Sequence, residues 1–174
     1  MIIKSVKTPV PLEELFSRLR KIKDELSQLG GEDRPGKESV SSGTHIVVQI
    51  VDPKIYSSYR VIEAAYENAV SSFANGTNRA REMSNEFLLW LACDDNFNTA
   101  IKTAGIKSNR GFVLIVIAKD QGKNDKSSEK DEKKIFDSMA KELDLEIVKD
   151  LAGFSDPKKE KEHLERMALH KLNR

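Results

Sequence analysis

The sequence predicts one α/β domain with about four strands and about six helices. Its 174 residues, 39% of them hydrophobic, are enough to bury one sizeable core. Two runs rich in β-branched residues, 44–51 and 112–118, predict strands. Several longer segments repeat apolar residues every three or four positions, which predicts amphipathic helices. Because no internal repeat or change in composition divides the chain, we expect a single domain over residues 1–174.

The first part of the chain predicts a strand, a helix and a second strand. Residues 1–7 predict a short strand, and residues 12–29 carry one apolar stripe that is typical of an amphipathic helix. Gly30 then ends this helix, because glycine tolerates the left-handed conformation found there. We expect residues 30–43, which are rich in Gly, Ser and Pro, to form a flexible loop before the strand at 44–51.

A long helix and a short apolar helix follow. Residues 56–75 predict the long helix, and the hydroxyl of Ser84 is expected to cap the next one. Residues 87–93 are apolar at every position, so a helix there must be covered on more than one side. Burial inside the monomer is the simpler interpretation, and a protein–protein contact through Trp90 is the alternative.

The central segment predicts a short helix and a buried strand. Asp94 and Asp95 interrupt the apolar run and favour a helix cap with solvated carboxylates. A short helix is expected over 97–104, before Gly105. Residues 112–118 are wholly apolar, which predicts a strand covered on both faces and central in its sheet. Residues 119–130 lack apolar side chains, and we expect a solvated flexible loop.

The last part of the chain predicts two more helices and an edge strand. Residues 135–143 carry an apolar stripe, and residues 145–148 predict a short edge strand. Asp156 followed by Pro157 is a typical helix start, with the aspartate as cap and the proline in the first turn.

Residues that usually carry catalysis or bind cofactors form no recognisable motif. Cys93 is the one cysteine, so it forms no internal disulfide and no cysteine metal cluster, and burial would keep its thiol neutral. No glycine loop has the strand–loop–helix pattern that cradles phosphate. The three histidines lack zinc-binding spacing and favour surface or structural roles: His45, His163 and His170. We therefore expect no metal, no cofactor and no catalysis of its own.

Charge and hydropathy restrict the partners and the location. The chain has 29 basic and 28 acidic residues, which argues against a protein that grips a long stretch of nucleic-acid backbone. A small basic patch remains possible. The longest apolar runs are too short to span a bilayer, and the first residues do not form a signal peptide, so a cytoplasmic protein is expected.

Three stretches resemble the family of kinase-binding subunits of the KEOPS (EKC) complex. Residues 50–70, IVDPKIYSSYRVIEAAYENAV, are similar to its strand end, Asp-Pro turn and alanine-containing helix. Residues 83–106 are similar to its Ser-x-Glu-apolar helix and to its Asn-Ile-x-x-Ala and Gly-Ile pattern. The strand FVLIVIA is the third stretch. Many archaeal members have a Gly-x-Arg-Gln-Ile-like element where this chain has residues 93–97, and the arginine is absent here.

The resemblance implies an antiparallel sheet flanked by helices and a non-catalytic accessory role. It implies binding to the small kinase/ATPase subunit of KEOPS and help in recruiting tRNA, through its 3′ end, for threonylcarbamoyladenosine modification. The chemistry would belong to other subunits.

Two sets of residues are candidates for these contacts. The expected kinase contact comprises Leu88, Trp90, Asn96, Phe97 and Ile101. Basic residues near the ends of the central helices are candidates for RNA contact: Arg79, Arg81, Lys102, Lys107 and Arg110. The alternative is a stand-alone small RNA-binding or ligand-binding α/β protein, and the latter would require a concave site with convergent polar groups.

Overall fold

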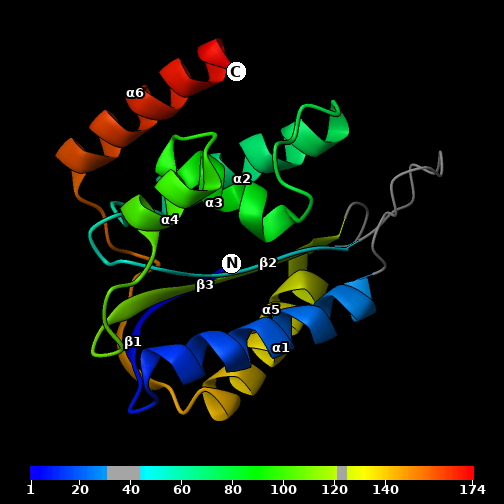
Figure 1. Cartoon of the computed structure of the whole chain (residues 1–174), viewed down its shortest axis with the longest axis vertical. Coiled ribbons are helices and arrows are strands. Elements are labelled where there is room, and N and C mark those ends of the chain that lie inside the picture. Colours follow the sequence, from blue (N-terminus) through cyan, green and yellow to red (C-terminus); the bar gives the residue numbers. More distant parts are fainter. Residues whose placement is uncertain (31–43, 121–124) are drawn as a thin grey trace.

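The fold is a four-stranded antiparallel sheet with helices on both faces, which confirms the predicted α/β class (Figure 1). The computed structural model describes residues 1–30, 44–120 and 125–174. The elements follow the chain in the order β1 (Ile2–Lys7), α1 (Leu12–Gly30), β2 (Thr44–Val51), α2 (Tyr59–Ala74), α3 (Met83–Ala92), α4 (Phe97–Ala104), β3 (Phe112–Asp120), α5 (Asp125–Glu142), β4 (Glu146–Asp150) and α6 (Pro157–Asn173).

Strand β3 lies inside the sheet, as its unbroken apolar sequence predicts. The strand order is β2-β3-β1-β4, and every neighbouring pair is antiparallel. Side chains of β3 alternate between two separate cores, because successive strand residues point to opposite faces. Ile115 belongs to the core beneath α2 and α3, whereas Leu114 belongs to the core beneath α1 and α5. Strand β4 lies at an edge, as predicted, and all five of its residues are exposed.

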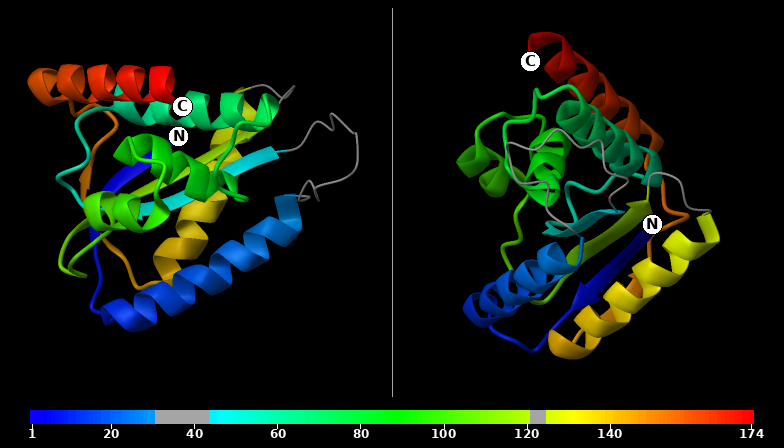
Figure 2. Two further views of the ribbon diagram at one scale, coloured as in Figure 1. Left: turned by 45° about the horizontal axis from the view of Figure 1, so that its top comes forward. Right: turned by 90° about the vertical axis from the view of Figure 1, so that its right-hand side faces the viewer.

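The helices form unequal layers on the two faces of the sheet. Helices α1 and α5 cover one face, and α2, α3 and α4 cover the other (Figures 1 and 2). Helix α6 lies outside α2, farther from the sheet, so this side of the molecule is two helices deep (Figure 2). No helix in the described ranges is long and apolar enough to cross a membrane.

Polar caps set where two of the helices begin. The side chain of Asp156 accepts a hydrogen bond from the Lys159 N–H at 3.2 Å, which confirms the predicted start of α6. Helix α2 begins three residues later than predicted because Ser58 caps it by accepting from the Val61 N–H at 3.3 Å. Tyr56 precedes the helix and donates its hydroxyl to the Leu151 carbonyl at 2.6 Å.

The predicted cap at Ser84 is wrong. Helix α3 begins at Met83, two residues earlier than a cap at Ser84 would place its start, and its N-cap residue Glu82 makes no side-chain cap hydrogen bond. The Ser84 hydroxyl instead accepts from the Val48 N–H of β2 at 3.1 Å. Since β2 is an edge strand, Ser84 satisfies a backbone donor that has no strand beside it.

Helices and strands extend into the ends of both predicted loops. Strand β3 continues through Asp120 and α5 begins at Asp125, so regular structure occupies both ends of the predicted 119–130 loop. The first turns of α5 are rich in Lys and Glu, which favour helix but give no apolar periodicity. Of the other loop, 30–43, only Gly30 lies within the described residues, where it ends α1.

Candidate partner-binding surface

Helix α4 is short, and local hydrogen bonds determine its position. The Asn96 side chain accepts from the Thr99 N–H at 3.2 Å and caps the helix. Asp94 accepts from the Asn96 N–H at 2.7 Å and so fixes the cap itself. Ala100 and Ala104, one turn apart, are fully buried, which lets α4 approach α3 closely.

The outer face of α4 presents two large apolar side chains to solvent. Phe97 is 41% exposed and Ile101 is 44% exposed, and their spacing of four places them on the same face of the helix. The connected stretch from residue 96 to 111 contains three basic residues and no carboxylate. This surface therefore combines an apolar pair with local positive charge, which suits a partner that is apolar at its centre and acidic at its rim.

Leu88 and Trp90, the other apolar candidates, lie in the core of the monomer. Their exposed fractions are 5% and 3%. Helix α3 is enclosed by the sheet at β2 and by α2 and α4, which explains why its sequence is apolar on every side. The Trp90 indole N–H donates to the Ser72 hydroxyl at 3.0 Å, so its polar atom is satisfied internally. Of the expected contact residues, the structure thus brings Asn96, Phe97 and Ile101 together at the surface.

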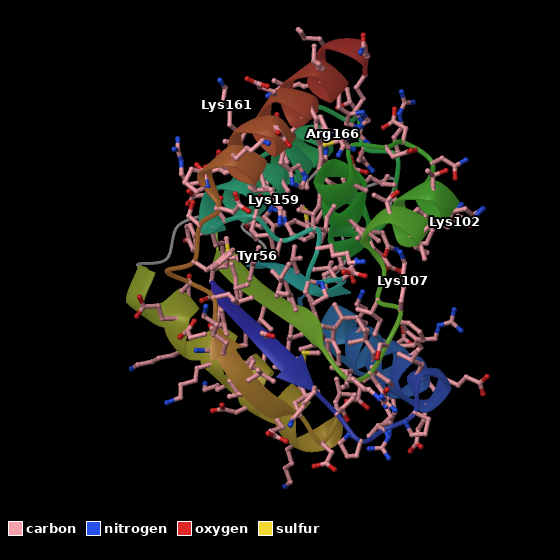
Figure 3. All side chains as sticks on the ribbon, turned by 90° about the vertical axis from the view of Figure 1, so that its left-hand side faces the viewer. Tyr56, Lys102, Lys107, Lys159, Lys161 and Arg166 are labelled. Atoms are coloured by element: carbon pink, nitrogen blue, oxygen red, sulfur yellow. The ribbon has the colours of Figure 1, made fainter. Side chains whose placement is uncertain are left out.

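The five basic candidates are exposed but belong to different segments. Arg79 and Arg81 lie in the connection between α2 and α3, and the Arg79 guanidinium is 3.7 Å from an Asp95 carboxylate oxygen. Lys102 lies on α4, and Lys107 and Arg110 lie between α4 and β3. Figure 3 shows Lys102 and Lys107 near each other on the side of the molecule that also displays three basic residues of α6: Lys159, Lys161 and Arg166.

Helix α6 supplies polar groups to the end of α3. His163, which is buried, lies with its Nε2 2.7 Å from the Leu91 carbonyl oxygen, and Arg166 donates to the Ala92 carbonyl at 3.5 Å. These carbonyls belong to the last turn of α3, where the helix itself provides no donors. His163 therefore has the structural role that its sequence context favoured, and burial lowers its pKa.

Cys93 ends α3 in a left-handed conformation, with φ of 54°. Burial raises the pKa of its thiol, although the nearby Arg166 acts in the opposite direction. A raised pKa leaves less thiolate, so the environment does not activate this cysteine. Across the part of the chain that the structure describes, no three His, Cys, Asp or Glu side chains gather closely enough to hold a metal ion.

Sequence reasoning missed a buried charge cluster beneath α6. The Glu86 carboxylate is fully buried, and the Arg174 side chain, 4% exposed, lies against it. Asp95, expected to be simply solvated, also contacts Arg174, at 2.8 Å. The available signal was Glu86 itself, because a carboxylate beside an all-apolar helical run requires a buried partner.

A comparison with protein families gives one match over most of the chain. Residues 6–169 match the family described as kinase binding protein CGI-121. A search of curated proteins found no match.

Proposed function

Because this chain belongs to the CGI-121 family of kinase-binding proteins, we propose that it is a non-catalytic accessory subunit of the KEOPS complex. In that role it binds the kinase/ATPase subunit and helps to recruit tRNA for threonylcarbamoyladenosine modification. The family match over residues 6–169 is the observation that supports the kinase contact, since it spans nearly the whole fold rather than one motif. The modification chemistry would reside in other subunits, and the protein would act in the cytoplasm, and also in the nucleus if the source is eukaryotic.

The proposed kinase contact is centred on the outer face of α4. Phe97 and Ile101 are exposed apolar side chains on one face, and Asn96 lies at the start of the same helix. Large apolar side chains grouped at a surface are the usual centre of a binding interface. Leu88 and Trp90 would contribute from behind, by fixing the position of α3, on which α4 packs.

The proposed tRNA contact uses the basic residues beside this surface. Lys102, Lys107 and Arg110 lie within residues 96–111, a stretch of sequence that contains no carboxylate. Such a small patch suits a limited contact with phosphates, made within a larger complex, better than independent binding to a long RNA.

Titration calorimetry with the KEOPS kinase subunit from the same organism tests the proposal. We expect tight one-to-one binding by the wild-type chain. Replacing both Phe97 and Ile101 by serine should weaken binding by about 30-fold or more, because apolar anchors at the centre of an interface each contribute on the order of 1–2 kcal/mol.

The matched control is Phe16→Ser. Phe16 is 46% exposed but lies on α1, on the opposite face of the sheet, so its replacement should leave kinase affinity unchanged. Equal weakening by both variants would remove α4 from the contact. If the kinase does not bind although both proteins are folded, the kinase role itself fails, and stand-alone RNA or ligand binding becomes the leading function.

A further inference from the structure

The Arg174 guanidinium lies in a buried cluster of groups that match its chemistry. Its Nη1 is 2.6 Å from Glu86 Oε1, and its Nε is 2.8 Å from Asp95 Oδ1. Its central carbon lies 4.5 Å from the centre of the Trp90 ring, as in a cation–π contact. Nη1 also donates to the Ser72 hydroxyl at 3.3 Å. Two carboxylates, a hydroxyl and an aromatic face together are typical of arginine recognition.

Three members of this cluster, Glu86, Ser72 and Trp90, are held in place without help from Arg174. The second Glu86 carboxylate oxygen accepts from the backbone N–H groups of Arg79 and Ala80, both at 2.9 Å. Ser72 accepts from the Trp90 indole and donates to the Asn68 carbonyl, each at 3.0 Å. Because these bonds come from α2, α3 and their connection, the cluster is largely preorganised.

The end of α6 is attached to the body almost entirely through polar side chains. Residues 168–174 bury no apolar side chain, and the leucines point outward: Leu169 is 59% and Leu172 is 82% exposed. Only His170, whose ring packs edge-on against Trp90 at 5.2 Å, and Arg174 reach inward in this segment. The preceding turns are anchored differently, by the buried side chains of His163 and Met167.

Closing this segment over the cluster carries a desolvation cost. Four polar atoms there are buried without a hydrogen bond of good geometry: Glu86 Oε1, Arg174 Nε and Nη2, and His170 Nε2. Buried charges gain little over hydrated ones unless their hydrogen bonds are well formed. With little apolar area buried as well, the closed arrangement of residues 168–174 is only weakly favoured over an open one.

We propose that Ser72, Glu86, Trp90 and Asp95 form a guanidinium-binding site, which this chain fills with its own Arg174. Residues 168–174 are then a strap that closes over the site and opens when Arg174 leaves it. An arginine side chain from another protein has the chemistry to take the same place. This inference is independent of the proposed kinase contact on α4.

Chemical rescue of Arg174→Ala tests the site, with the single tryptophan, Trp90, as the reporter. We expect the variant to show red-shifted tryptophan emission, and amide exchange in residues 168–174 to become about tenfold faster or more. Millimolar guanidinium chloride or arginine methyl ester should bind the variant saturably and reverse the emission shift, whereas sodium chloride at equal ionic strength should not. The wild-type protein should not respond, because its site is already filled.

Lys171→Ala is the matched control, since Lys171 is an exposed cation in the same turn of α6. The Lys171→Ala variant should keep the wild-type tryptophan emission and the wild-type rate of amide exchange in residues 168–174. A folded Arg174→Ala variant that ignores guanidinium, or a control that behaves like it, would overturn the proposal. If Arg174→Ala does not fold, Arg174→Lys replaces it: lysine keeps the charge but loses the planar fork, so guanidinium should still compete for the site. An Arg174→Lys protein indistinguishable from wild type in emission and exchange would also refute a guanidinium-specific site.

Discussion

Gly105 shows why a single residue type is required at the end of α4. A Cβ atom at this position would lie 2.4 Å from the Ile101 backbone oxygen, closer than non-bonded atoms can approach. Its backbone φ of −69° is open to any residue, so the requirement is space rather than a left-handed conformation. We predict that Gly105→Ala lowers the free energy of unfolding by about 1–3 kcal/mol, because the helix end must shift to relieve the contact. Chemical denaturation measures the change.

Gly111→Ala is the control for this prediction. A Cβ atom there would meet nothing within 4 Å, so the substitution should alter stability by less than about 0.5 kcal/mol. Equal stability of the two variants would show that the end of α4 yields easily and that Gly105 is not a steric requirement.

Single residues differ in how far their roles follow from the sequence. The cap Asp156 could be predicted, because it bonds to a backbone N–H three residues later. Before α4 the sequence pointed to the carboxylates of Asp94 and Asp95, whereas the neighbouring Asn96 is the cap. The role of Ser84 could not be predicted, because its hydroxyl bonds to β2, 36 residues away in the chain. The partner of Glu86 is more distant still, since Arg174 directly follows the last helix and no local pattern joins the two residues. Hydrogen bonds between residues close in the sequence can be predicted from it, whereas polar pairs between distant residues depend on the fold.

At the scale of elements, the attachment of α6 to α3 depends on an uncharged histidine. Burial lowers the pKa of His163 from its ordinary value of 6.5, while the contact with the Leu91 carbonyl opposes this shift and Arg166 adds to it. Between the lowered pKa and 6.5, the unfolded chain binds a proton that the folded chain does not. The contribution of His163 to the free energy of unfolding must therefore fall as the pH drops through 6.5, and it levels off below the folded-state pKa.

His163→Gln tests this dependence. Glutamine does not titrate and has an N–H donor, so the variant should lose less stability than the wild type between neutral pH and about pH 5. Thermal unfolding of both proteins across this range gives the comparison. Parallel pH profiles would mean that His163 contributes nothing to the acid sensitivity of the fold.

The sequence predicts the helices and strands better than it predicts which of them pack against each other. Every strand and helix expected from apolar spacing is present, because burial on one face imposes a period that the sequence must follow. The start of α5 could not be predicted from apolar spacing, because the first turns of this helix have no apolar residue. The all-apolar sequence of α3 favoured burial but left a partner contact through Trp90 open, and the packing of the surrounding elements places Trp90 inside.

At the scale of the whole molecule, two cores share one sheet. Leu114 and Ile115 are neighbours on β3 and are both fully buried, but they face opposite layers. We predict that Leu114→Ala lowers the free energy of unfolding by about 2–5 kcal/mol, as expected for removing a large buried side chain. Trp90 lies in the other layer, yet its fluorescence transition should shift by the same amount as the circular dichroism transition, because loss of β3 disrupts both cores.

Non-coincident transitions would contradict this prediction. If circular dichroism reported early loss of structure in Leu114→Ala while Trp90 fluorescence kept the wild-type midpoint, the two layers would be separate cooperative units. Ile115→Ala is the companion variant, since it removes a buried side chain from the layer that contains Trp90.

The central position of β3 also affects how the chain is made on the ribosome. Strand β1 is translated before both of its neighbours in the sheet, β3 and β4, and its Ile2 pairs with Val116. During synthesis β1 therefore remains without strand partners until β3 has been translated, and it gains its second neighbour later still, when β4 appears. Contacts between such distant segments form slowly and leave strand edges open to wrong pairing in the meantime. Nascent chains of this protein should therefore depend on chaperones until β3 is released, and a ribosome stalled before β3 would display an unpaired β1.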